Sequence, residues 1–183
     1  GVGNLFSVIK SLESIGVTPK IVSSPEEILK ADRIILPGVG SFQSAMDELK
    51  AKGYNDAIID FVKQGNPLMG ICLGAQVLMT QSEEFGNIAG LNLIQGSVIS
   101  LKQFDPHSKM IYRVPHVGWS KLVEPTITEK DEMEYLNLKN ELLSKRWKNS
   151  ILENISIGTE VYFAHSYKIV PEDRAQLVSV CFY

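Results

Sequence analysis

The chain has 183 residues, 44% of them hydrophobic, and a formal net charge of −3; this suffices for one globular domain with a sizeable core and gives no reason to expect nucleic acid or an anionic membrane as partner. Its only cysteines, Cys72 and Cys181, form no CxxC or metal-ligand spacing, so we expect neither a disulfide framework nor a metal site. No apolar run approaches the roughly 18 residues of a membrane span and no signal-peptide pattern opens the sequence, so we expect a soluble, cytoplasmic protein.

The first forty residues predict two helices and two short strands. Apolar residues at helical spacing predict a helix over 5–15 with Asn4 as its N-cap. A short strand is expected at 21–22. Ser24, followed by proline and two glutamates, has the pattern of a capped helix start. An apolar strand is then expected over 33–36.

The next segments continue the alternation of helix and strand. Helical patterns cover 42–50 and 55–64, an apolar strand ends at Cys72, and a helix is expected from about 74 to 82. Strands separated by helices of this length predict βαβ units. We therefore expect an α/β fold: a doubly wound, flavodoxin-like, mostly parallel sheet with helices on both faces and the cysteine at the carboxyl end of a central strand.

Beyond residue 88 the pattern changes to short strand-like pieces. They are expected at 91–94, 97–101, 161–169 and 177–183, and the charged segment 131–149 is expected to be helical. No internal repeat, low-complexity tract or interdomain linker is found. The sequence thus predicts a single domain over 1–183.

Gly70, Cys72 and Gly74 form a G-x-C-x-G motif between the predicted strand and helix. This is the layout of a nucleophile elbow with a thiol in place of the hydroxyl. Glycines two residues either side of the cysteine remove Cβ atoms that would clash in a sharp turn, and a helix N-terminus favours thiolate over thiol. The alternative is a small buried cysteine at a tight strand–helix turn.

A thiolate that attacks an amide or ester also needs an oxyanion hole and a base. The N–H of Leu73 would supply one donor. The Pro37-Gly38-Val39-Gly40 loop, at the end of the neighbouring predicted strand, would supply another, because its glycines allow the backbone to approach a ligand or to flip. The alternative for this loop is an ordinary strand-to-helix turn.

With both motifs in view, the chain resembles the class I (triad) glutamine amidotransferases, and within them the glutaminase subunits of imidazole glycerol phosphate synthases. Six blocks carry the resemblance, in family order and over nearly the whole chain. They are GVGNL at 1–5, LPGVGSF at 36–42, GICLGAQ at 70–76, SEE at 82–84, PHVGW at 115–119 and YFAHSY at 162–167.

The resemblance implies that Cys72 forms a γ-glutamyl thioester and releases ammonia for a partner synthase, with no cofactor. It places the oxyanion hole at the N–H groups of Leu73 and of the Val39–Gly40 turn. It also implies two sets of binding residues. The glutamine pocket would contain Gly38, Gln76, Glu84 and the backbone around His165, Ser166 and Tyr167, and the partner would dock over Asn4 and Trp119. For Glu84 the alternative is a solvated loop carboxylate.

The chain departs from the family pattern in its histidines. The family triad is completed by a His-Pro-Glu motif near the C-terminus, and no His-Pro pair occurs here. His107 is expected in an exposed loop, His116 is expected to be structural beside Trp119, and His165 matches a pocket-lining position. We expect the base to follow residue 183 in a longer protein and a first strand to precede residue 1. Ser120 also stands where the family usually has asparagine.

Four functions remain open on these grounds. The preferred one is glutamine hydrolysis with ammonia transfer to the cyclase subunit of imidazole glycerol phosphate synthase, in a heterodimer of histidine biosynthesis. The closest rival is the same chemistry for a surface-polysaccharide sugar amidotransferase. An inactive scaffold subunit follows if the His-Pro-Glu motif is truly absent. A γ-glutamyl hydrolase acting alone is disfavoured by the GVGNL and PHVGW blocks.

Overall fold

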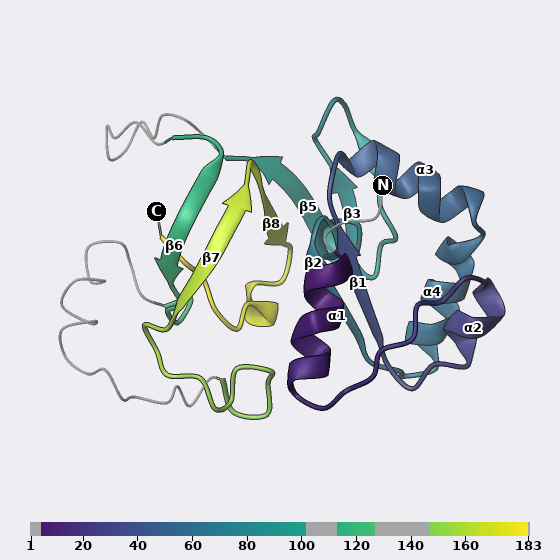
Figure 1. Cartoon of the computed structure of the whole chain (residues 1–183). Helices are drawn as coiled ribbons and strands as arrows, with labels where there is room; N and C mark the ends of the chain where they lie inside the picture. Colours follow the sequence, from purple (N-terminus) through teal and green to yellow (C-terminus); the bar gives the residue numbers. More distant parts are fainter. Residues whose placement is uncertain (1–4, 102–112, 127–146, 183) are drawn as a thin grey trace. The chain divides into compact units, whose positions relative to one another are not determined.

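A computed structural model describes residues 5–101, 113–126 and 147–182 of the chain (Figure 1). Its contacts divide the chain into two compact units. The first unit comprises 1–100 and 167–172, and the second unit comprises 101–166 and 173–183. No helix within the described residues is long and apolar enough to cross a lipid bilayer.

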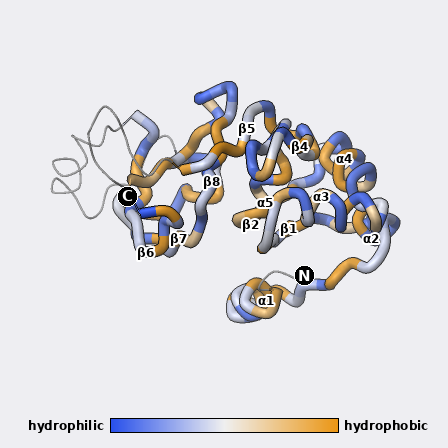
Figure 2. The backbone as a smooth tube through the Cα atoms, turned by 90° about the horizontal axis from the view of Figure 1, so that it is seen from above, coloured by the Kyte–Doolittle hydropathy of each residue, from blue (hydrophilic) through white to orange (hydrophobic). Residues whose placement is uncertain are grey.

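The helices of the first unit follow the sequence pattern closely. They are α1 Leu5–Ser14, α2 Pro25–Leu29, α3 Phe42–Ala51 and α4 Tyr54–Lys63. The Ser24 side chain caps α2 by accepting a hydrogen bond from the Glu27 N–H, as predicted. In Figure 2 the backbone of α1 carries both apolar and polar colours, in keeping with its amphipathic spacing. The strand expected at 21–22 is absent, because no neighbouring backbone pairs with it.

Two parallel strands carry the predicted elbow. Strand β1 Ile34–Gly38 pairs in parallel with β2 Leu68–Cys72, and the pairing runs to the last residue of each strand, where Gly38 faces Cys72. The parallel βαβ arrangement expected from the alternation is confirmed. Figure 1 shows α2, α3 and α4 gathered beside this strand pair.

A second sheet in the first unit is mixed. Its strands are β4 Ile88–Ala89, β3 Met79–Ser82, β5 Ile94–Ser100 and β8 Tyr167–Pro171, in that order across the sheet. Strands β3 and β5 are parallel, and β3–β4 and β5–β8 are antiparallel. The first unit is therefore an α/β structure, and its β8 strand comes from a distant part of the chain.

The helix expected from 74 to 82 is wrong in its extent. Helix α5 covers only Leu73–Gln76, and strand β3 begins at Met79. Val77, Leu78 and Met79 are all buried, and such a run does not distinguish a helix from a buried strand by periodicity. The N–H groups of Leu91 and Leu93 donate to the carbonyls of Val77 and Leu78, and of the expected 91–94 strand only Ile94, the first residue of β5, lies in a strand.

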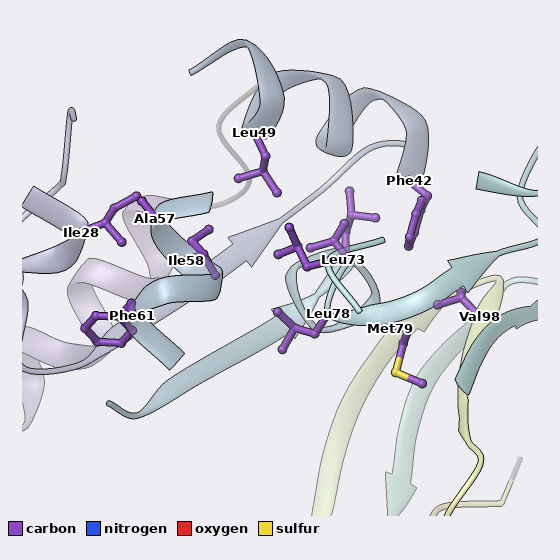
Figure 3. Packing of buried hydrophobic residues seen from close by; sticks show 12 residues of the cluster. Ile28, Phe42, Leu49, Ala57, Ile58, Phe61, Leu73, Leu78, Met79 and Val98 are labelled. Carbon is purple, nitrogen blue, oxygen red and sulfur yellow. The ribbon is translucent and has the colours of Figure 1, made fainter. Parts of the chain in front are cut away.

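The core of the first unit is one apolar cluster (Figure 3). Phe42 and Phe61 are completely buried, and burial of each such side chain contributes about 1.5–3 kcal/mol. The fully or nearly fully buried members are Ile28, Phe42, Leu49, Ala57, Ile58, Phe61, Leu73, Val77, Leu78, Met79, Leu91 and Val98. Leu73, directly after Cys72, belongs to this cluster, so the elbow is anchored in the core.

The second unit contains an antiparallel pair, β6 His116–Lys121 and β7 Glu160–His165. The run expected as one strand over 161–169 is broken at Ser166, because β7 pairs with β6 whereas β8 pairs with β5. The strand expected at 177–183 is reduced to one bridge at Val180 in the described residues, after the short 3-10 turn η2 Arg174–Gln176.

Trp147 anchors the remaining part of the second unit. It is completely buried, and its indole N–H donates to the Val178 carbonyl at 2.7 Å, which satisfies the one polar group of this large apolar side chain. The helix expected at 131–149 lies outside the described residues up to position 146.

Candidate active site

Cys72 has an unusual backbone conformation. It ends β2 and is the residue before α5, with φ 55° and ψ −120°. A residue other than glycine in such a conformation costs on the order of 1–3 kcal/mol and persists only where the surrounding structure enforces it. The side chain is exposed. The sharp turn of an elbow is therefore present, and the alternative of a buried structural cysteine is wrong.

The flanking glycines are required by close backbone contact. A Cβ on Gly74 would overlap the carbonyl oxygen of Leu36 in β1, and one on Gly70 would lie 2.5 Å from the Cα of Ala75. Neither neighbour is a flexible side-chain end that could move aside. The reason given for G-x-C-x-G in the sequence, removal of Cβ atoms at a tight turn, holds at both positions.

The short length of α5 changes one part of the argument for the thiol. The helix has four residues, so its dipole at Cys72 is much smaller than that of the longer helix expected from the sequence. The N–H of Leu73, at the first helical position, still has no acceptor within the helix. The elbow therefore offers backbone donors beside the thiol rather than a strong helix field.

The Pro37–Gly40 loop starts beside the cysteine. Gly38 is the register partner of Cys72, so the loop leaves β1 at the level where the thiol leaves β2, about 5 Å away across the strand pair. Val39 is 55% exposed, and Gly40 has φ 102° with no atom close to the position of a Cβ. The loop ends at Ser41, which caps α3 by accepting from the Ser44 N–H.

Glu84 is not the solvated loop carboxylate of the alternative interpretation. It is half-buried, and its Oε2 accepts a hydrogen bond from the Phe42 N–H at 2.7 Å. Its own N–H donates to Ser82 Oγ at 3.1 Å. Glu84 therefore lies against the start of α3, and this helix start directly follows the Pro37–Gly40 loop and Ser41 in the chain. The sequence pattern gave no signal of this contact between positions 42 residues apart.

Gln76 and Tyr167 lie together in the first unit. The Gln76 side-chain amide reaches the Tyr167 carbonyl at 3.4 Å, a long hydrogen bond. Two residues expected in one pocket from separate blocks are thus neighbours. Strand β8, which carries Tyr167, brings them together.

The other expected site residues are not in the described part of the first unit. His165, Ser166 and Trp119 belong to the second unit, and Asn4 lies outside the described residues. Trp119 is 67% exposed and makes an edge contact with Tyr162, their ring centroids 5.5 Å apart.

His116 and His165 form a cluster that sequence reasoning missed. They are register partners in β6 and β7, with His116 Nδ1 3.2 Å from His165 Nε2 and His116 Nε2 3.0 Å from Ser120 Oγ. His116 also stacks on Phe163, so its described ring contacts are with Phe163 and His165 rather than Trp119. Burial, and then the neighbouring His165, lower the pKa of His116. His116 is buried within this cluster, which Ser120 completes.

Across the described ranges, no three His, Cys, Asp or Glu side chains are grouped so that they could hold a metal ion.

Comparisons with known proteins agree with the motifs. The family model described as "Glutamine amidotransferase class-I" matches residues 1–182. "Imidazole glycerol phosphate synthase subunit HisH 1" of Legionella pneumophila (strain Paris) is 36% identical over 94% of this chain and 73% of its own length. The corresponding HisH subunits of Syntrophotalea carbinolica and Bacillus subtilis are 36% and 38% identical over 100% and 88% of this chain, and over 79% and 77% of their own lengths.

One solved structure shares the fold. It is described as "Crystal structure of glutamine amidotransferase", with a TM-score of 0.53 and 20% identity, over 66% of this chain and 59% of that one. At this level of identity the likeness supports the α/β fold.

Proposed function

Because this chain belongs to the class I glutamine amidotransferases, we propose that it hydrolyses glutamine at Cys72 and supplies the ammonia to a synthase subunit. The observation that carries the proposal is the exposed Cys72 in its strained elbow, paired in register with the glycine that starts the oxyanion loop. A thiol held in this way suits attack on an amide carbonyl.

The proposed reaction has two stages. The Cys72 thiolate attacks the side-chain amide carbon of glutamine, and the Leu73 and Val39–Gly40 N–H groups stabilise the tetrahedral oxyanion. Collapse breaks the C–N bond: the leaving amide nitrogen takes up one proton and departs as ammonia, and a γ-glutamyl thioester remains on Cys72. Water then attacks the thioester, giving glutamate and regenerating the thiol.

Proton transfer needs a base near the sulfur. The first unit contains no histidine, and His116 uses both ring nitrogens in contacts within the second unit. We therefore place the base outside the first unit and assign His116 to packing.

The glutamine pocket is proposed from the same residues. Glu84 would hold the substrate ammonium by charge, and Gln76 with the backbone of Gly38 and of Tyr167 would hold its other polar groups. The contact between Gln76 and the Tyr167 carbonyl supports this assignment.

The partner is proposed from the names of the relatives and from an exposed face. The matching proteins are named as subunits of imidazole glycerol phosphate synthase, so we propose a heterodimer with a cyclase subunit in histidine biosynthesis. Asn4 and Trp119 would contact that subunit, and Trp119 is 67% exposed. We propose the cytoplasm as the location, because two free cysteines without a disulfide are typical of proteins in a reducing compartment.

The test combines labelling and turnover. The protein is assayed for glutaminase activity with a cyclase subunit of imidazole glycerol phosphate synthase, and its thiols are labelled with the glutamine mimic diazo-oxo-norleucine. We expect label on Cys72, and loss of both label and activity in Cys72→Ser. The matched control, Cys181→Ser, keeps both. Label that survives Cys72→Ser and maps to Cys181 would overturn the assignment of the nucleophile. Ammonia transfer to a sugar amidotransferase and not to the cyclase would overturn the proposed cyclase partner.

A further inference from the structure

A carboxylate remote in sequence binds the start of helix α3. The Phe42 N–H donates to Glu84 Oε2 at 2.7 Å, a distance typical of a charge-assisted hydrogen bond. Phe42 is the first residue of α3, and its N–H has no acceptor within the helix. Glu84 therefore satisfies a donor that would otherwise depend on water.

Both ends of this contact are fixed by buried groups. The Phe42 ring is completely buried in the core. On the other side, the Glu84 N–H donates to Ser82 Oγ, and Ser82 is completely buried at the end of β3. The Glu83 N–H also donates to the Val98 carbonyl of β5. The carboxylate is held by the mixed sheet, so its contact ties α3 to that sheet.

Charge favours the same contact. Helix α3 has ten residues and no acidic side chain in its own first turn. A carboxylate near a helix N-terminus is stabilised by the free N–H groups and the helix dipole. Glu84 supplies this charge from outside the helix.

The contact between Glu84 and Phe42 fixes one end of the oxyanion loop, the segment from Gly38 to Phe42. At its first end, Gly38 is paired with Cys72. At its second end, Phe42 is bound by Glu84. Val39, Gly40 and Ser41 lie between these two ends. No described atom lies within 4 Å of the position that a Cβ would take at Gly40. The two ends of the loop are thus held in place, the second one by the Glu84 carboxylate, and the Val39–Gly40 peptide lies between them.

We propose that Glu84 is a positioning residue: through the Phe42 N–H it fixes the oxyanion loop, in addition to any contact it makes with substrate. This inference rests on the proposed glutaminase function. It predicts that Glu84 affects the rate of the chemical step through hydrogen-bond acceptance and not only through charge.

The kinetic test compares two substitutions in the protein bound to its synthase partner. Both Glu84→Ala and Glu84→Gln remove the charge, and both are expected to raise KM. Only glutamine retains an oxygen that accepts from the Phe42 N–H. We expect kcat of Glu84→Ala to fall by about tenfold or more, the factor for loss of a hydrogen bond to a charged group, with kcat of Glu84→Gln at least about fivefold above that of Glu84→Ala. Equal kcat values in the two variants would overturn the proposal.

The matched control is Glu83→Ala. Glu83 is exposed and adjacent, so its removal changes the surface charge by the same amount; we expect kcat and KM to stay within about twofold of the parent protein. A loss of kcat in Glu83→Ala equal to that in Glu84→Ala would assign the effect to general charge and refute the positioning role.

A second measurement does not depend on turnover. Hydrogen exchange of the Phe42 and Gly40 amides is followed by NMR in the parent protein and in both Glu84 variants. We expect faster exchange at both amides in Glu84→Ala, by about tenfold at Phe42, and partial protection in Glu84→Gln. Unchanged exchange at Phe42 would contradict the inference. If the protein shows no glutaminase activity, the proposed function fails, and the exchange data still decide whether Glu84 fixes the loop.

Discussion

The positive φ of Cys72 occurs where the backbone on both sides is closely packed, at Gly70 against Ala75 and at Gly74 against Leu36. Gly74 lies against the Leu36 carbonyl, so the chain after the thiol passes directly over β1. We predict that Gly74→Ala lowers the free energy of unfolding by about 3 kcal/mol or more, at the upper end of overpacking costs, since the new Cβ meets backbone. Chemical denaturation followed by circular dichroism measures this change.

Gly65→Ala is the control for that prediction. Gly65 also has a positive φ, 85°, but nothing lies within 4 Å of its Cβ position. Its substitution should cost only the left-handed backbone penalty of about 1–2 kcal/mol. Equal losses in the two variants would show that the close approach of the elbow to β1 is not what Gly74 protects.

Single residues were predictable where the chemistry is local. The sequence motif places Gly70, Cys72 and Gly74 within five positions, and the structure has the sharp turn that this spacing predicts. The contact between Glu84 and the Phe42 N–H joins positions 42 apart. No periodicity or motif encodes which backbone donor a carboxylate will meet, so this contact had to come from the folded chain.

Among the elements, the β6–β7 pair contains the contact between buried His116 and half-buried His165. His116 is 4% exposed, and burial with the nearby His165 lowers its pKa below the usual value of about 6.5. The unfolded chain then binds more protons than the folded one between the two pKa values. The free energy of unfolding should therefore fall as the pH drops below about 6.5, and this loss should be absent at higher pH.

We predict that the Tm falls between pH 7.5 and pH 5.5, and that His116→Gln makes this fall smaller while lowering the Tm at both pH values through lost packing on Phe163. Differential scanning fluorimetry at the two pH values measures both effects. His107→Gln serves as the control and should keep the parent pH dependence. A parent-like fall in the His116 variant would place the sensitivity in another group.

Element boundaries were predictable where a polar N-cap residue marks the start of a helix. Ser24 marks the start of α2 in the sequence, and its hydroxyl accepts a hydrogen bond from the Glu27 N–H there. The run from Val77 to Met79 offers no such mark. It is apolar throughout, and its change from turn to strand is imposed by pairing of Met79 with Ile94 in β5, a tertiary contact that local pattern does not report.

For the whole molecule, we predict activity that depends on the partner. The Val39–Gly40 peptide has a glycine with φ 102° at its end and open space around it, so two peptide orientations are accessible, with the donor toward or away from the oxyanion. One such donor contributes about 10²–10³ in rate. We expect low glutaminase activity in the isolated subunit and a rise by about that factor when the synthase partner and its ligand are added.

Two variants test the origin of that rise. Gly40→Ala should reduce it, because an alanine at φ 102° is strained and shifts the loop, and Asn4→Ala should weaken the coupling. Alkylation of Cys72 by iodoacetamide should be unaffected in Asn4→Ala. A full rate in the isolated subunit, unchanged by the partner, would contradict gating and favour a hydrolase that acts alone.

Strand β8 is synthesised long after the elbow with which it forms the first unit, because ribosomes make the chain from its N-terminus. Strand β8 at Tyr167–Pro171 forms one edge of the mixed sheet of the first unit. Its first residue, Tyr167, lies 91 positions after Gln76, and the Tyr167 carbonyl accepts a hydrogen bond from the Gln76 side-chain amide. At about 5–20 residues per second, that interval lasts about 5–20 s. Throughout it, the nascent polypeptide carries the nucleophilic sulfur without the strand that lines the proposed pocket. We therefore expect that a chain still being translated hydrolyses no glutamine before β8 has been made.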